Sequence, residues 1–167
     1  MNLPAWPYPK TIAHRGAGKL APENTLAAIR HGVSFGYRAT EIDVKLSGDG
    51  TLLLMHDDTN RCSDGRGRVA AKTWHQLALL DAGSWHSKDY AGEPIPTYWR
   101  VAKYCIANGV MLNTEIKPCI GRERETVEEI NGHADEAHQQ RVGRERHVAR
   151  RGSLVGEDQQ RCVAGER

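Results

Sequence analysis

The chain has 167 residues, 39% of them hydrophobic, and a formal net charge of +2 from 23 lysines and arginines against 21 acidic residues. This length allows one domain with a buried core but falls short of the roughly 250 residues of a complete eight-stranded α/β barrel. The interspersed charges leave no basic face for nucleic acid or an anionic membrane, and no segment is apolar enough to cross a bilayer.

The first predicted unit is a strand, a loop and a helix. Residues 10–14 favour a short strand after a proline-rich lead-in, and the glycine-containing segment 15–21 predicts the loop that leaves it. Pro22 predicts the start of a helix that Gly36 ends, because its apolar residues recur at helical spacing.

Two strands joined by a tight turn are predicted next. Residues 39–46 alternate between apolar and charged side chains, and a four-residue turn leads to a second strand over 51–55. Four residues are too few for a helical crossover, so we expect an antiparallel hairpin. Pairing the residues on either side of the turn places Glu41 opposite His56.

The remaining regular elements alternate in type. Residues 57–95 are rich in loop formers and hold one short helix that begins at Thr73 and runs through Leu80. A helix is predicted over 97–108 and a strand over 110–116. Alternation of strands and helices indicates the α/β class.

The composition changes after residue 118. All ten aromatic residues, all seven prolines and all seven lysines precede residue 119, whereas the last 49 residues hold nine arginines and ten acids. Such a segment buries little apolar surface, so we expect residues 119–167 to form a disordered or partly helical tail. The capping-box pattern Thr126-x-x-Glu129 predicts a local helix toward Gln140.

Four cysteines are widely spaced and form no C-x-x-C pair, which indicates reduced thiols rather than a zinc site or a disulfide framework. The N-terminal segment is interrupted by prolines and lacks the apolar run of a signal peptide. We therefore expect a cytoplasmic protein without nucleic-acid partners or membrane insertion.

Candidate chemistry lies at the ends of the predicted strands. Alternate strand residues share a face, so the patterns Glu41-Ile42-Asp43 and Glu115-Ile116-Lys117 each point two ionisable groups the same way. Three carboxylates brought together repel one another unless a cation lies among them, and oxygen ligands suit Mg²⁺ or Ca²⁺. The sequence therefore predicts a divalent metal on Glu41, Asp43 and Glu115.

Two histidines and two further cations complete this set. His14 and His56 suit a general acid and base near neutral pH, one accepting a proton from the attacking oxygen and the other donating one to the leaving oxygen. Arg15 can hold two phosphate oxygens in fork geometry, and Lys117 adds a point charge. This combination favours phosphodiester cleavage over acyl or hydride transfer.

These motifs, together with Pro22-Glu23-Asn24-Thr25, resemble the glycerophosphodiester phosphodiesterase family, in particular its cytoplasmic bacterial members, over residues 5 to about 118. The resemblance implies an incomplete TIM-type (β/α) barrel in residues 1–118, with 57–95 as a small insertion and 119–167 as a non-homologous tail. It implies metal-dependent hydrolysis of glycerophosphodiesters to glycerol 3-phosphate and an alcohol, impaired in this chain by the missing barrel units. It also implies the roles given above to the residues that match its motifs: His14, Arg15, Glu41, Asp43, His56, Glu115 and Lys117.

Two alternatives stay open. One is a non-catalytic metal- or phosphate-binding fragment, or a module whose charged tail docks on a partner, which metal-dependent turnover of glycerophosphocholine would exclude. The other is a phospholipase D-like relative on the same fold, which activity on a full lipid but not on its deacylated form would favour.

Overall fold

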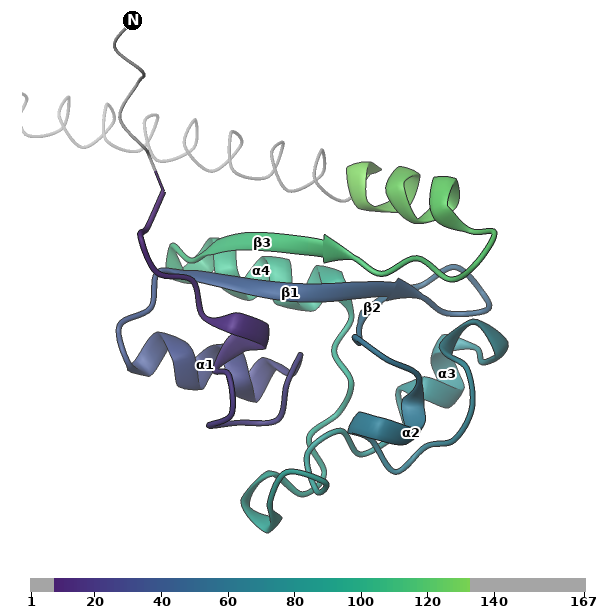
Figure 1. The fold of residues 1–167 in the computed structure, drawn as a ribbon, viewed down its shortest axis with the longest axis horizontal. Coiled ribbons are helices and arrows are strands. Elements are labelled where there is room, and N and C mark those ends of the chain that lie inside the picture. The colour runs from purple at the N-terminus through teal and green to yellow at the C-terminus, as the bar shows by residue number, and fades with distance from the viewer. Residues whose placement is uncertain (1–7, 133–167) are drawn as a thin grey trace, which may run out of the picture. The chain divides into compact units, whose positions relative to one another are not determined.

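The computed structural model describes residues 8–132, and within that part the chain up to Ile130 forms one compact unit. The unit is built around a three-stranded sheet in the order β2-β1-β3, with helices packed on it (Figure 1). In chain order the elements are η1 (His14–Gly16), α1 (Leu26–Ser34), β1 (Ala39–Leu46), β2 (Leu52–Leu54), α2 (Thr59–Cys62), η2 (Val69–Ala71), α3 (Trp74–Leu77), η3 (Lys88–Tyr90), α4 (Tyr98–Asn108) and β3 (Met111–Ile116).

The central strand β1 separates an apolar layer from a polar face. Ile42, Val44 and Leu46 are fully buried and pack in one cluster with residues of α1 and α4. Complete burial of each such side chain contributes about 1.5 to 3 kcal/mol to folding. Because side chains alternate along a strand, the odd-numbered residues of β1 face the other way, and these include Glu41 and Asp43.

The parallel partner β3 brings its own alternate residues onto the same polar face. Asp43 pairs with Glu115 and Glu41 pairs with Asn113 in the ladder between β1 and β3. The helix before this strand matches its prediction, since Thr97 caps α4 by accepting a hydrogen bond from Arg100 N–H and Gly109 ends it with a left-handed φ of 63°.

Strand β2 connects two apolar clusters. Leu52 and Leu54 belong to the cluster around β1, whereas Leu53 and Met55 belong to a second cluster formed with residues of the 57–95 segment. That segment therefore has a small core of its own, joined to the sheet through one short strand.

The hairpin of β1 and β2 is antiparallel as predicted, but its register differs by one residue. Ser47 N–H donates to Thr51 O at 2.9 Å, and Leu46 pairs with Leu52. Because Thr51 is used to close the turn, Glu41 does not lie opposite His56, and the predicted pairing was wrong.

Two further predictions at the N-terminus were wrong in extent. The strand expected over 10–14 is reduced to one parallel bridge between Ala13 and Thr40, because the η1 turn begins at the next residue. Helix α1 begins at Leu26 rather than Pro22, because Asn24 has a left-handed φ of 58° and Thr25 caps the helix. Two predictions in the 57–95 segment also differ from the structure. The helix that begins after Thr73 ends at Leu77 rather than Leu80, and α2 lies where only loop was predicted.

The segment after β3 packs more than its composition suggested. A helix begins at residue 123, and Thr126 lies inside it, fully buried, donating its hydroxyl to Arg122 O rather than capping. Arg122 donates to Ser47 O at 2.5 Å, and Ile130 packs against the cluster around β1. Residues 119–130 therefore include a helix near Thr126, as predicted, but pack more closely on the sheet than their composition suggested; the rest of the tail lies outside the described residues.

Cys62, Cys105 and Cys119 are free thiols, which agrees with the expectation for these three, and Cys162 lies outside the described residues. In the part of the chain that the structure describes, no helix has both the length and the apolar character needed to cross a membrane. The cytoplasmic location stays a prediction.

Candidate active site

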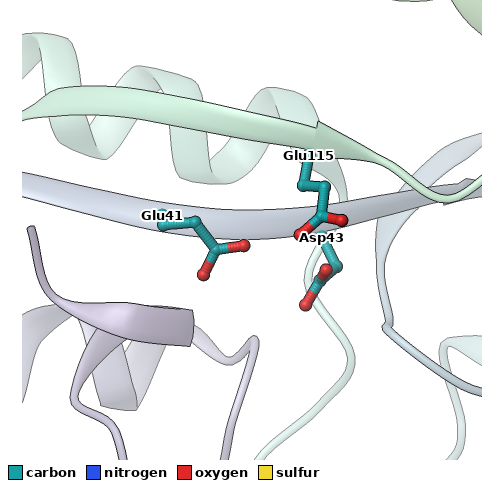
Figure 2. Close-up of side chains that lie close together, drawn as sticks. All are labelled: Glu41, Asp43 and Glu115. Carbon is teal, nitrogen blue, oxygen red and sulfur yellow. The ribbon is translucent and has the colours of Figure 1, made fainter.

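Three carboxylates meet on the polar face of the sheet. Glu41 and Asp43 extend from β1 and Glu115 from β3, and each offers an oxygen within 4.8 Å of the other two (Figure 2). The parallel register that pairs Asp43 with Glu115 is the cause of this convergence. The structure thus brings together the three residues predicted from the two strand motifs.

Asp43 is the most buried member of this cluster, with no exposed surface. Its Oδ2 accepts a hydrogen bond from Asn24 Nδ2 at 2.8 Å, whereas its Oδ1 has no hydrogen-bond donor. Glu41 is similar, because its Oε2 accepts from Arg15 N–H at 2.9 Å and its Oε1 is buried without a donor. Buried carboxylate oxygens without donors are costly, and a bound cation satisfies both.

Arg15 is held in place from several sides. Its φ of 49° is left-handed, which turns its backbone N–H toward Glu41. Its guanidinium donates to Glu23 Oε1 at 2.8 Å, and its Nε lies 3.2 Å from Asp43 Oδ2 as an ion-pair contact. The side chain is only 14% exposed, so the cation is fixed beside the carboxylates.

Lys117 approaches the same carboxylates from the end of β3. Its Nζ lies 3.8 Å from Asp43 Oδ1 and hydrogen-bonds Glu115. The hydrogen bond from Lys117 lowers the pKa of Glu115 and raises the pKa of Lys117. Both groups are therefore charged at neutral pH, so Glu115 is a carboxylate that can bind a metal and Lys117 is a cation that can bind an anion.

Asn24 and Glu23 are site residues to which sequence reasoning assigned no role. Asn24 donates to the Asp43 carboxylate and accepts from Asp43 N–H at 2.9 Å, so its amide clamps that residue twice. Glu23 orients the Arg15 guanidinium. Their place in the Pro22-Glu23-Asn24-Thr25 motif was the available signal. It was missed because a helix was expected to start at Pro22, which assigned both residues to its first turn.

The two histidines differ in how firmly they are held. His14 Nε2 lies 4.0 Å from Glu41 Oε2, and its side chain is 67% exposed. His56 Nδ1 lies 2.8 Å from Asp57 Oδ1 and is 24% exposed. Burial alone raises the pKa of Asp57, but hydrogen bonds from His56 and Arg61 lower it overall, so this carboxylate is ionised and accepts the Nδ1 proton. In the tautomer that places a proton on Nδ1 for this contact, the lone pair of His56 lies on Nε2.

The chemistry of the arrangement follows from its charges. Three oxygen-donor side chains can hold a hard divalent cation such as Mg²⁺ or Ca²⁺. Two cations beside them can bind an anionic substrate, and an imidazole with a free Nε2 can move a proton. These groups match the needs of phosphodiester cleavage.

Comparison with known proteins gives one family. The model of the glycerophosphoryl diester phosphodiesterase family matches residues 14–155, which extends past the predicted boundary at residue 118. A glycerophosphodiester phosphodiesterase of Caldanaerobacter subterraneus subsp. tengcongensis is 40% identical over 107 residues, 64% of this chain and 44% of that protein. Human glycerophosphodiester phosphodiesterase 1 is 38% identical over 109 residues, 64% of this chain and 33% of that protein.

The solved structures agree. A phosphodiesterase of Oleispira antarctica, in complex with the product sn-glycerol-3-phosphate, has a TM-score of 0.71 and 41% identity, covering 79% of this chain and 52% of that one. The chain thus spans about half the length of these relatives, or less. Together the likenesses confirm the predicted fold class, an incomplete TIM-type barrel.

Proposed function

Because the chain belongs to the glycerophosphoryl diester phosphodiesterase family, we propose that it hydrolyses glycerophosphodiesters to glycerol 3-phosphate and an alcohol. The observation that carries this proposal is the carboxylate cluster of Glu41, Asp43 and Glu115 with Arg15 and Lys117 beside it. The product bound to the Oleispira antarctica relative is the product expected here.

Glu41, Asp43 and Glu115 would hold a divalent metal, Mg²⁺ or Ca²⁺. The two buried oxygens without donors, Glu41 Oε1 and Asp43 Oδ1, fit this role. When bound, such an ion neutralises negative charge that develops on the phosphate oxygens. Asn24 fixes the Asp43 carboxylate, so the ligand set is held before a cation arrives.

Arg15 and Lys117 would bind the phosphate oxygens. Both cations now contact Asp43, and a phosphate offers them the same kind of anionic partner. Glu23 keeps the planar guanidinium in one orientation, so little side-chain entropy is lost when substrate binds.

His14 and His56 would move the protons. Attack of a water oxygen on phosphorus forms one P–O bond and breaks the P–O bond to the alcohol. One histidine accepts the proton of the water, and the other donates a proton to the departing alkoxide. Asp57 is a positioning residue, because it fixes the Nδ1 proton of His56 and leaves Nε2 for the reaction.

The direct test is release of glycerol 3-phosphate from glycerophosphocholine by the purified chain, with Mg²⁺, with Ca²⁺ and after treatment with a chelator. In a full-length homologous protein, the replacements that correspond to His14→Ala and His56→Ala each remove most turnover, since acid-base steps are worth about 10²- to 10⁴-fold. Turnover that persists unchanged in both variants would sink the assigned roles.

Thermal unfolding gives a second measurement that does not require turnover. A cation bound to the native carboxylates raises the unfolding temperature, and the stabilisation grows with the logarithm of the ratio of the cation concentration to its Kd. Glu115→Gln abolishes this shift, whereas Glu129→Gln, on the exposed surface of the helix after β3, leaves it unchanged. An equal shift in both variants contradicts the metal site.

A further inference from the structure

A hollow of about 310 Å³ lies at the carboxyl ends of β1 and β3, the two strands that carry the carboxylate cluster. Its walls are formed by Lys45 at the end of β1, by Asp58, Arg68 and Ala70 from the segment after β2, and by residues 118–120 after β3. Barrel enzymes keep their substrates at this end of the strands.

The charge of the hollow is unlike that of the cluster. Neither Lys45 nor Arg68 makes a side-chain hydrogen bond or ion pair with another residue between 8 and 132, whereas Arg15 and Lys117 both contact carboxylates. The acid in the wall, Asp58, accepts a hydrogen bond from Val69 N–H at 3.2 Å. Two cations with no anionic partner among residues 8–132 thus line the hollow together with Asp58, and the rest of its wall is formed by Ala70, Pro118, Cys119 and Ile120.

The hollow is within reach of a phosphate held in the cluster. Lys45 follows Asp43 by two positions on the same face of β1, a separation of roughly 7 Å along the strand. On the other strand Pro118 directly follows Lys117. A group attached to the phosphate through a few bonds therefore extends from the cluster into the hollow.

We propose that this hollow is the subsite for the leaving alcohol and that Lys45 and Arg68 select alcohols that carry an anionic group, such as a phosphate ester. This inference rests on the proposed function, since it takes the cluster as the phosphodiester site. An anion between two unpaired cations forms charge-assisted hydrogen bonds, and the apolar wall weakens competition from water. A choline alcohol brings a positive charge to the same cations and binds less well.

The first experiment maps binding of inorganic phosphate by ¹⁵N-resolved NMR titration of the full chain. We expect saturable shifts of the Arg68, Ala70 and Ile120 amides, distinct from shifts at Arg15 and Lys117. The residue-resolved readout separates the hollow from the cluster and needs no turnover.

Charge variants define the residues responsible. Lys45→Gln and Arg68→Gln each weaken phosphate binding at the hollow about five-fold, the equivalent of about 1 kcal/mol for a partly exposed charge contact. Lys45→Arg retains binding because it keeps the charge. Arg66→Gln, two residues from Arg68 and outside the hollow, is the matched control and changes nothing.

The second experiment compares two diesters, glycerophosphocholine and glycerophosphoinositol phosphate, by direct binding and by turnover. The parent chain prefers the anionic diester, and Lys45→Gln reduces that preference. Equal affinity for both diesters, or unchanged phosphate shifts at the hollow in Lys45→Gln and Arg68→Gln, overturns the proposal.

The two proposals fail in different ways. Phosphate shifts at the hollow without hydrolysis of any diester, either by this chain or by a longer variant that supplies the missing barrel units, refute the proposed function while the anion site stands. Hydrolysis of glycerophosphocholine with no saturable shift at Arg68, Ala70 and Ile120 refutes the subsite while the function stands.

Discussion

At the scale of single residues, Asn24 shows how much of the site depends on one amide. It combines a left-handed φ of 58° with two hydrogen bonds to Asp43 and is itself almost fully buried. Asparagine tolerates this conformation better than other side chains that carry both a donor and an acceptor. One residue therefore ends the loop before α1 and fixes a proposed metal ligand.

We expect Asn24→Gly to reduce the free energy of unfolding by about 1 to 3 kcal/mol, because it leaves Asp43 without its hydrogen-bond partner. Glycine accepts the left-handed backbone, so the variant isolates the amide from backbone strain. Urea unfolding measures the loss, and cation titration followed by thermal unfolding measures a parallel loss of metal affinity. A variant as stable as the parent, with equal cation affinity, contradicts the clamp.

The buried thiols give a prediction that depends on pH. Burial raises the pKa of Cys62 and of Cys105 to about 12, from an ordinary value of 9.0. The thiolate is the reactive form, so iodoacetamide at pH 8 labels neither residue in the native chain and both after denaturation. Mass spectrometry of the labelled peptides provides the measurement.

The same thiols affect stability in alkali. Because their pKa is higher in the folded state, the folded chain retains protons that the unfolded chain loses, and stability decreases as the pH rises from about 9 toward 12. In the labelling experiment with iodoacetamide, equal modification of Cys62 and Cys105 in native and denatured protein at pH 8 would exclude burial of these thiols.

At the scale of elements, the close approach of α1 and η1 depends on two glycines. A side chain at Gly32 would place its Cβ 2.2 Å from Gly16 O, and a Cβ at Gly16 would lie 2.7 Å from that of Ala28. The atom in the way at Gly32 belongs to the backbone of η1, which carries His14 and Arg15. Helix packing thus determines where these two site residues lie.

We therefore expect Gly32→Ala to lower the free energy of unfolding by about 1 to 3 kcal/mol and to weaken cation binding, because η1 must shift. Gly132→Ala is the matched control, since that helical glycine has nothing within 4 Å of its Cβ position. The control equals or exceeds the parent in stability by up to about 1 kcal/mol. Denaturant unfolding of both variants shows whether the loss of stability in Gly32→Ala comes from the clash with η1 or from the helix propensity of alanine.

Periodicity predicted the elements that carry most of the site. The strand over 39–46 and the helix after Thr97 are where alternation and capping placed them, because their local signals agree with their packing. The three-carboxylate cluster followed from two strand motifs and needed only that β1 and β3 be neighbours.

What could not be predicted from the sequence depends on contacts between distant residues. The hydrogen bond from Ser47 N–H to Thr51 O sets the hairpin register. The hydrogen bonds between Asn24 and Asp43 keep Asn24 out of the helix, so α1 begins after it. Thr126 and Ile130 are packed because the helix that carries them lies against other parts of the fold. The amino-acid composition of the tail gives no information about such contacts.

At the scale of the whole molecule, β3 is an edge strand of the sheet in the described part and pairs with β1 alone. Its side chains are half-buried or exposed, including Met111 and Ile116. A barrel strand normally has neighbours on both sides, whereas here the free edge of β3 leaves the side chain of Glu115 54% exposed. Catalytic side chains must be positioned within roughly 0.5 Å, which requires support from the surrounding structure.

We accordingly expect the 167-residue chain to hydrolyse glycerophosphodiesters poorly. The comparison is a longer variant in which the residues after 118 are replaced by the matching part of the Caldanaerobacter subterraneus relative, assayed for glycerol 3-phosphate release with and without Mg²⁺ or Ca²⁺. Gel filtration over a range of concentrations detects association through the edge strand β3. Comparable metal-dependent rates from the two chains would show that residues 1–118 suffice.

The sequence spacing of the site contacts has a consequence for the order of folding. Arg15 reaches Glu41 across 26 residues and Asn24 reaches Asp43 across 19, so the contacts of two of the three carboxylates are closed by short stretches of chain. Glu115 lies 72 residues after Asp43 in the chain, so its approach to the cluster requires a much longer and slower closure. The growing polypeptide therefore assembles a preformed acidic pair early and meets the repulsion of the third carboxylate last. A divalent cation that binds the early pair would lower this final barrier, so we expect refolding to speed up in its presence while unfolding slows.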